Sequence, residues 1–366
     1  MLLAIGWGLY YNTSRPWVKE VLGYSYNFLF LLMAVEYAPL LLALIAGIIS
    51  DYIGRIRAIY IGLLQSLAFI AAPFLDLKTL PILILIASLA SILPWVNIVA
   101  LSMVIGRRSG TTYSRIALGS SLGFGLSGVI TLVLDALCRE FDVLILLTYI
   151  IASISTGIST ILVLIVAKRV GEYRDFLVIN FGDLLKFITK NSKQISIVIL
   201  SFTSIFLGVL IAWNALSLKL YGILNNVGLF GLISATIPAF TAAISRPSIG
   251  KFIDLLGPMK SYLVCLIAYL LYLTAMFIAP SHVFIILWFI PIYPLLDTST
   301  YILSAHMFPL SMQGSASGLV IMGQGIAGLL ALLTNLTELN YYSIYLVVLL
   351  SIIIALISSL IIKPIR

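Results

Sequence analysis

The chain has 366 residues, of which 62% are hydrophobic and only 9% are charged, and its mean hydropathy is +1.17. Apolar runs of about 20 residues recur over its whole length, which as helices are long enough to cross a hydrocarbon core of about 30 Å. They lack the alternation of barrel strands. This composition excludes a water-soluble globular enzyme and predicts an all-α integral membrane protein. The formal net charge is +8, but the basic residues are scattered over short loops, so no nucleic-acid partner is expected.

The first apolar run begins at Met1, without a preceding basic region or a small-residue cleavage site, and is expected to be a membrane helix and not a signal peptide. Cys138 and Cys265 fall in or beside separate apolar segments and have no metal-ligand spacing. We therefore expect neither a metal nor another cofactor.

Twelve membrane-spanning helices are predicted. Their expected bounds are 2–20, 25–49, 58–75, 81–105, 115–137, 143–167, 194–218, 226–248, 260–279, 282–304, 312–335 and 342–362. The only long polar connection, residues 168–193, divides them into two blocks of six. We expect domains at 1–167 and 194–366, joined by a cytoplasmic linker that contains a short amphipathic helix on the membrane surface.

The basic residues fall mainly on one side of this topology. Sixteen of the 21 Lys and Arg residues, Arg246 among them, lie on the side of the linker, and five lie on the other: Arg15, Lys19, Lys78, Arg139 and Lys219. Because cytoplasmic loops collect Lys and Arg, both termini are expected in the cytoplasm of a multi-pass protein of the cell membrane.

Two short patterns recur in the second block. Gly47, Asp51 and Gly54 are repeated as Gly250, Asp254 and Gly257 at an offset of 203, each time between the second and third helices of a block. The strings GFGLSG at 123–128 and GQGIAG at 323–328 recur in the fifth helices. These repeats indicate a tandem duplication, which in transporters places the binding site at the repeat interface.

The first pattern resembles the signature of the major facilitator superfamily, a Gly, three residues, an Asp, a basic residue, one residue, a Gly and then basic residues. Gly47, Asp51, Gly54 and Arg55 meet it, and Arg57 follows, whereas Tyr52 stands where a basic residue is usual. The resemblance extends over essentially the whole chain. It implies two six-helix bundles that rock about a cavity lined mainly by helices one, four, seven and ten.

A cytoplasmic gate is expected at the repeated motif. The eleventh helix begins at the cytoplasmic face, so its positive N-terminal end is available to Asp51. By pseudo-symmetry Asp254 would face the fifth helix. The resemblance implies the same gating role, with Arg55 or Arg57 nearby and glycines that allow close packing; ordinary solvated loop charges are the alternative.

The two GxGxxG strings do not predict a dinucleotide site, because neither follows a strand and no βαβ unit fits within a membrane span. Small residues on one helix face instead favour close helix packing.

Two carboxylates lie inside predicted spans, where each needs a proton, a partner or water. Asp297 is in helix ten, shares a face with Tyr293 and Tyr301, and follows Pro291 and Pro294. We expect it to bind substrate or protons. Glu36, near the middle of helix two, is expected to take part in coupling or in an interhelical pair.

Further binding candidates lie on helices one, four and seven. Tyr11 and Arg15 recur at a spacing of four on helix one, where Arg15 could serve an anionic solute, pair with Asp297 or Glu36, or extend to the outer interface. Trp95 and Asn214 are expected to contribute stacking and hydrogen bonds. The family resemblance implies a basic residue in helix four of proton antiporters and a glycine-proline pattern in helix five of drug antiporters. This sequence has neither, which weakens the hypothesis of multidrug efflux.

The sequence thus predicts secondary active transport of a small organic solute by alternating access, with or against protons, by a lipid-embedded monomer. Efflux of hydrophobic, drug-like compounds is an alternative, as is a solute sensor with a transporter fold. No loop carries the paired acids or metal ligands of a membrane enzyme, so no enzyme activity is expected.

Overall fold

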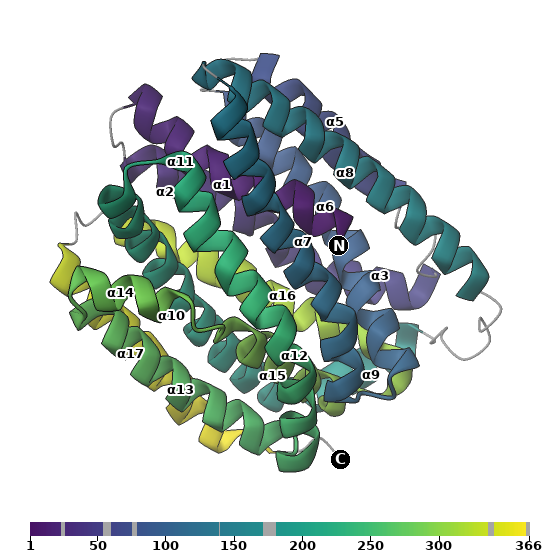
Figure 1. The fold of residues 1–366 in the computed structure, drawn as a ribbon. Coiled ribbons are helices and arrows are strands. Elements are labelled where there is room, and N and C mark those ends of the chain that lie inside the picture. The colour runs from purple at the N-terminus through teal and green to yellow at the C-terminus, as the bar shows by residue number, and fades with distance from the viewer. Residues whose placement is uncertain are drawn as a thin grey trace.

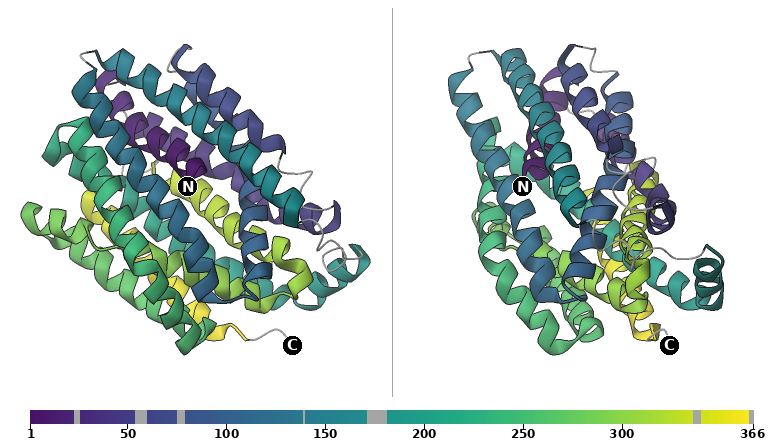
Figure 2. Two further views of the ribbon diagram at one scale, coloured as in Figure 1. Left: turned by 45° about the vertical axis from the view of Figure 1, so that its right-hand side comes forward. Right: turned by 90° about the vertical axis from the view of Figure 1, so that its right-hand side faces the viewer.

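The computed structural model describes residues 1–22, 26–53, 60–74, 79–138, 140–170, 181–335 and 340–363, and every regular element within these ranges is a helix. The helices form two pseudo-symmetric bundles. In Figure 1 the purple to teal helices of the first half lie mainly toward the top and right, and the green to yellow helices of the second half lie mainly toward the bottom and left. The two further views show the same separation (Figure 2).

The helices of the first half occupy residues 2–170. They are α1 (Leu2–Leu22), α2 (Tyr26–Tyr37), η1 (Ala38–Leu42), α3 (Ala43–Ile53), η2 (Tyr60–Gly62), α5 (Leu63–Ala71), η3 (Ala72–Phe74), α6 (Leu80–Ile105), α7 (Gly110–Leu137) and α8 (Phe141–Val170).

The second half has the same arrangement. Its elements are α10 (Ser192–Leu224), α11 (Val227–Gly231), η6 (Leu232–Thr236, a π-helical turn), α12 (Ile237–Leu256), α13 (Pro258–Ile278), α14 (Ser281–Trp288), α15 (Tyr293–Met307), η7 (Leu310–Met312), α16 (Gln313–Asn335) and α17 (Tyr341–Ile361).

By length and hydropathy, nine helices in the described ranges can cross a membrane, and α14 with α15 can make a tenth although they meet at 44°. The two remaining expected spans correspond to α1, which carries Arg15, and to the short apolar helix Leu63–Phe74. The fold is therefore consistent with twelve spans.

The short helix α9 (Phe181–Lys190) lies between the halves in sequence, as the linker prediction requires. Its Phe187 packs against Phe308 at the end of α15, with the ring centroids 5.4 Å apart. Its place on the membrane surface and the domain limits at 167 and 194 stay predictions.

Several helices extend further than expected at the end of the molecule where Asp51 lies. The helix with Asp51 continues to Ile53, and α12 continues to Leu256, so that Asp51 and Asp254 are in the last turns of helices and not in loops. Hydropathy ends a span at the first charge, whereas the backbone continues as a helix until a residue stops it. Gly257, with φ +79°, stops α12, and Pro258 then starts α13.

Glycines allow the two halves to pack closely. On α7, a Cβ at Gly128 would overlap the carbonyl oxygen of Gly231 and the side chain of Thr236 from the other half. On α16, a Cβ at Gly325 would lie 2.5 Å from the backbone nitrogen of Leu41. The GxGxxG strings are thus at the interface of the halves, and the packing interpretation is consistent with the structure.

The tenth span is broken between α14 and α15, where Pro291 precedes the second helix and Pro294 stands in its first turn. Side-chain hydroxyls hydrogen-bond to backbone carbonyls near the break. The Thr241 hydroxyl donates to the Phe289 carbonyl at 3.1 Å, and the Tyr272 hydroxyl donates to the Leu287 carbonyl at 3.2 Å. Irregular backbone at membrane depth is stable where protein covers it or where it lines a cavity.

Replacing Gly128 by Ala is expected to destabilise the protein, because the added methyl group meets backbone of the other half and overpacking costs roughly 1–3 kcal/mol. The midpoint of thermal unfolding in detergent should fall by several degrees. Gly222→Ala is the matched control, since nothing lies within 4 Å of its Cβ position, and it should leave the midpoint unchanged or raise it. Equal midpoints for the two variants would contradict the packing role.

Candidate functional site

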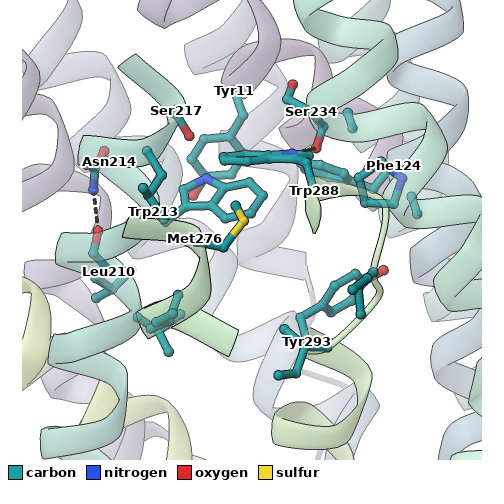
Figure 3. Close-up of a pocket in the computed structure, with 18 of the residues that line it drawn as sticks. Tyr11, Phe124, Leu210, Trp213, Asn214, Ser217, Ser234, Met276, Trp288 and Tyr293 are labelled. Atoms are coloured by element: carbon teal, nitrogen blue, oxygen red, sulfur yellow. Dashed lines mark hydrogen bonds between the residues drawn. The ribbon is translucent and has the colours of Figure 1, made fainter. Parts of the chain in front are cut away.

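A cavity of about 370 Å³ lies between the two halves. Helices α1, α2 and α7 contribute from the first half, and α10, α13 and the broken span of α14 and α15 contribute from the second. The π-helical turn η6 adds Ser234. Figure 3 shows Trp213, Trp288 and Tyr11 close together on one side of this space and Tyr293 on another.

Four of the eight predicted binding residues line the cavity: Tyr11, Arg15, Asn214 and Tyr293. Asp297, Tyr301, Glu36 and Trp95 do not, and α6, the fourth span, contributes no described residue. Helix five lines the cavity where helix four was expected, through Ser120, Ser121 and Phe124 of α7. Tyr301 is buried instead against Tyr113, with their ring centroids 5.4 Å apart.

Arg15 and Glu36 form an ion pair inside the first half. Both terminal nitrogens of Arg15 donate to the carboxylate at 3.1 Å, one to each oxygen, and the Tyr10 hydroxyl donates to it as well. The guanidinium also lies 4.7 Å from the centre of the Tyr11 ring. The Glu36 side chain is only 1% exposed, so each charge depends on the other. Extension of Arg15 to the outer interface is therefore wrong, and the alternative of pairing with Glu36 is the one observed.

Asp297 has a different partner from those considered in the sequence. One of its oxygens accepts from Arg246 of α12 at 2.8 Å, and the other accepts from the Tyr113 hydroxyl of α7 at 3.0 Å. Arg246 donates in addition to Ser121 of α7 at 2.7 Å, and Ser121 also accepts from Tyr293. This cluster joins the halves next to the cavity, because Ser121 and Tyr293 line the cavity while Asp297 and Arg246 lie behind them.

Arg246 is the charged residue that the sequence reasoning missed. It was counted among the basic residues of the linker side, but its side chain is 3% exposed inside α12. The available signal was its position within the predicted span 226–248, where a buried cation needs an acid. The partner could not be identified, because Asp297 lies 51 positions away.

Asp51 binds the N-terminal end of α16. Its carboxylate accepts from the backbone N–H groups of Gly314 and Ser315 at 3.0 and 2.8 Å, and from the Ser315 hydroxyl at 3.0 Å. Asp51 is 2% exposed, and a Cβ at Gly47 would overlap the Gly314 carbonyl. Free N–H groups and the helix dipole both favour a carboxylate at this position.

Asp254 makes the symmetric contact at the N-terminal end of α7. It accepts from the backbone N–H groups of Gly110 and Thr111 at 2.7 and 2.9 Å, and from the hydroxyls of Thr111 and Ser109 at 2.6 and 3.0 Å. Gly250 corresponds to Gly47 in this contact, since a Cβ added at Gly250 would lie 2.6 Å from the Gly110 carbonyl oxygen. Asp254 is exposed, unlike Asp51. Three further residues of the motif, Gly54, Arg55 and Arg57, lie outside the described residues.

The aromatic wall of the cavity was only partly foreseen. The rings of Trp213 and Trp288 lie 5.1 Å apart between centroids, and Tyr37, Tyr269 and Tyr272 also line the space. Aromatic residues are common in membrane helices as packing residues, so the sequence alone did not separate Trp288, Tyr37, Tyr269 and Tyr272 from the rest.

Two pseudo-symmetric helical bundles with a cavity between them define a membrane transporter fold. The model of the Major Facilitator Superfamily matches residues 1–332, and the chain belongs to this superfamily. A crystal structure of the E. coli fucose:proton symporter FucP is similar, with a TM-score of 0.65, 13% identity, and coverage of 99% of this chain and 98% of that one. A FucP structure in the outward conformation has a TM-score of 0.66 and 12% identity, with coverage of 99% and 96%. A search of curated proteins finds no match.

The pair of Arg15 and Glu36 can be tested by a double-mutant cycle. Glu36→Leu alone leaves a buried guanidinium without its counter-charge, Arg15→Met alone leaves a buried carboxylate without one, and each is expected to cost about 3–5 kcal/mol of stability. Arg15→Met combined with Glu36→Leu removes both charges and should recover most of that loss. Thermal unfolding in detergent measures both, and an additive result would contradict a direct pair.

Proposed function

We propose that this superfamily member is a secondary active transporter that moves a small organic solute across the cytoplasmic membrane by alternating access. The observation that carries the proposal is the position of the cavity: it lies between the halves, and at one end beyond it the halves are joined by the contacts of Asp51 and Asp254. Both contacts pair one half with a helix N-terminus of the other.

The gate residues suit a reversible closure. Each carboxylate meets backbone N–H groups that water could satisfy equally well, so the net energy of each contact is modest and the halves can separate without leaving buried groups unpaired. We propose that both termini face the cytoplasm, so that the closed end is the cytoplasmic one and the state is one closed to the inside.

We further propose that Asp297 is the coupling carboxylate. It faces Arg246 of α12, Tyr113 of α7, Tyr293 and Tyr301 of its own helix, and Tyr269 of α13. When Asp297 binds a proton, it loses the negative charge that holds Arg246. Its hydrogen bond from Tyr113 of the other half then weakens as well. Proton binding would thereby be linked to separation of the halves at this depth. The fucose:proton symporter, with the same fold, is a precedent for proton coupling, supporting the proposal by analogy alone.

Efflux of hydrophobic compounds remains a second candidate, favoured by the aromatic and aliphatic wall of the cavity. A sensor that binds its solute without moving it would show binding without flux. Solute counterflow in proteoliposomes separates transport from sensing, since only a transporter exchanges internal for external solute.

Asp297→Asn is expected to reduce solute-driven proton movement to the level of empty proteoliposomes, because an amide cannot take up a proton. Solute counterflow should persist, since it needs no net proton movement. A pH-sensitive dye inside the vesicles reports the protons. The control is Glu140→Gln, an exposed carboxylate at the start of α8, which should behave as the native protein. Retained proton movement in Asp297→Asn would remove Asp297 from the coupling role.

Asp51→Asn is expected to weaken the gate, because the amide loses the charge that interacts with the end of α16. A cysteine introduced at Ser114, which lies 3.3 Å from Thr298 of the other half, serves as the reporter after Cys138 and Cys265 are replaced by Ser. Its rate of labelling by an impermeant maleimide in inside-out vesicles should rise.

The matched control for the gate is Asp142→Asn, which lies in the first turn of α8 away from the interface of the halves. It should leave the labelling rate unchanged. If Asp51→Asn also leaves the rate unchanged, Asp51 does not close the cytoplasmic side.

A further inference from the structure

The substrate class can be inferred from the charges of the cavity, an inference that rests on the proposed function of the same site. Arg15 is the charged side chain among the described residues that line it. Glu36 neutralises Arg15 through two hydrogen bonds, and Tyr11 covers the guanidinium. Behind the wall, Asp297 is neutralised by Arg246. A solute in this cavity therefore meets no uncompensated charge.

An ionic solute would have to leave its charge unpaired or break one of these pairs. Either alternative is costly, because a buried charge without a partner is destabilised strongly in surroundings of low polarity. A neutral solute incurs neither cost. The electrostatics of the cavity thus select against anions and cations alike.

The hydrogen-bonding groups of the cavity make up the smaller part of its wall. No partner among the described residues is found for the hydroxyls of Ser120, Ser217, Ser234 and Tyr269, the indole N–H of Trp213, or the amide oxygens of Asn12 and Asn214. The Asn214 amide nitrogen is already engaged with the Leu210 carbonyl, as Figure 3 shows. A hexose with five hydroxyls can donate five hydrogen bonds and accept about ten. Most of the wall is apolar, so a polyol, which carries hydroxyls around its whole ring, would turn several of them toward aromatic and aliphatic side chains, where they find no partner.

The remaining surface is aromatic and aliphatic. Trp213 and Trp288 present their rings 5.1 Å apart at an angle of 38°, and Figure 3 shows Met276 beside Trp213 and Tyr11 nearby. Broad π faces of this kind stack on planar or ring-shaped apolar groups. A volume of about 370 Å³ is in the range of pockets that enclose small organic ligands.

We propose that the cavity binds a neutral amphipathic solute, with an apolar ring body that packs against Trp213 and Trp288 and one to three hydroxyl or carbonyl groups that bond to the serines and Asn214. The paired ions select against charged compounds, and the mostly apolar wall selects against polyols. The ion pair of Arg15 and Glu36 acts as a neutral wall of the cavity.

The experiment compares compounds that share a ring and differ in charge. Equilibrium dialysis measures the saturable binding of 2-(1-naphthyl)ethanol, 1-naphthylacetate, 2-(1-naphthyl)ethylamine and glucose to the protein in phosphatidylcholine nanodiscs, with binding to empty nanodiscs subtracted. The neutral alcohol should bind at least about tenfold more tightly than the anion, the cation or glucose, because only it avoids burying an unpaired charge or many hydroxyls.

Trp213→Ala should weaken binding of the alcohol by about tenfold through the lost stacking, and Trp213→Phe should retain most of it. Phe252→Ala, a partly exposed aromatic on α12 outside the cavity, is the matched control and should bind as the native protein does. Thermal unfolding of each variant shows whether it is folded.

If the anion, the cation or glucose binds as tightly as the alcohol, or if none binds above empty nanodiscs, the inferred substrate class is wrong. The proposed transport fails by a different result. Saturable binding of the alcohol with no counterflow of that compound in proteoliposomes would contradict transport and leave the substrate class standing.

Discussion

The structure depends on one constraint, that a charge within the membrane span must be neutralised by another. Arg15 and Glu36 meet it within the first half, and Arg246 and Asp297 meet it within the second. Each pair ties two helices of one bundle, so the bundles can move as units. The two pairs differ in one respect. The first is enclosed in its half with Tyr10, whereas the second also bonds Tyr113 of the other half and so connects the bundles.

The interface of the halves is built from contacts that can be made and broken at low cost. Glycines of α7 and α16 bring the backbones together, and the carboxylates of Asp51 and Asp254 bind N–H groups at helix ends. Such groups are satisfied by water when the halves separate. Stable bundles joined by a weak, polar and closely fitted interface are the mechanical requirement of alternating access, and the proposed coupling at Asp297 places a titratable group within this interface.

The cavity depends both on the paired charges and on the interface between the halves. The charges in and behind its wall cancel in pairs, so the surface offered to a solute is neutral. The tryptophans and the broken tenth span give this surface an aromatic shape. Tyr293 and Ser121 connect this surface to Asp297 through a chain of hydrogen bonds. A solute that rests on Tyr293 is therefore connected through Ser121 and Arg246 to the group proposed to exchange a proton.

The sequence by itself determined the membrane class, the approximate spans and the superfamily resemblance, because hydropathy, charge asymmetry and the repeated Gly and Asp positions are properties of local segments. It also pointed to Asp51, Asp254 and Asp297 as residues that need partners. For Asp51 and Asp254 the sequence also named the helices to contact, but only the tertiary structure decided the ion pairs, Asp297 with Arg246 and Arg15 with Glu36, and the presence of α7 instead of α6 at the cavity. Pairing between distant helices is set by the rotation and depth of each helix in its bundle, and a single sequence holds no local signal for either.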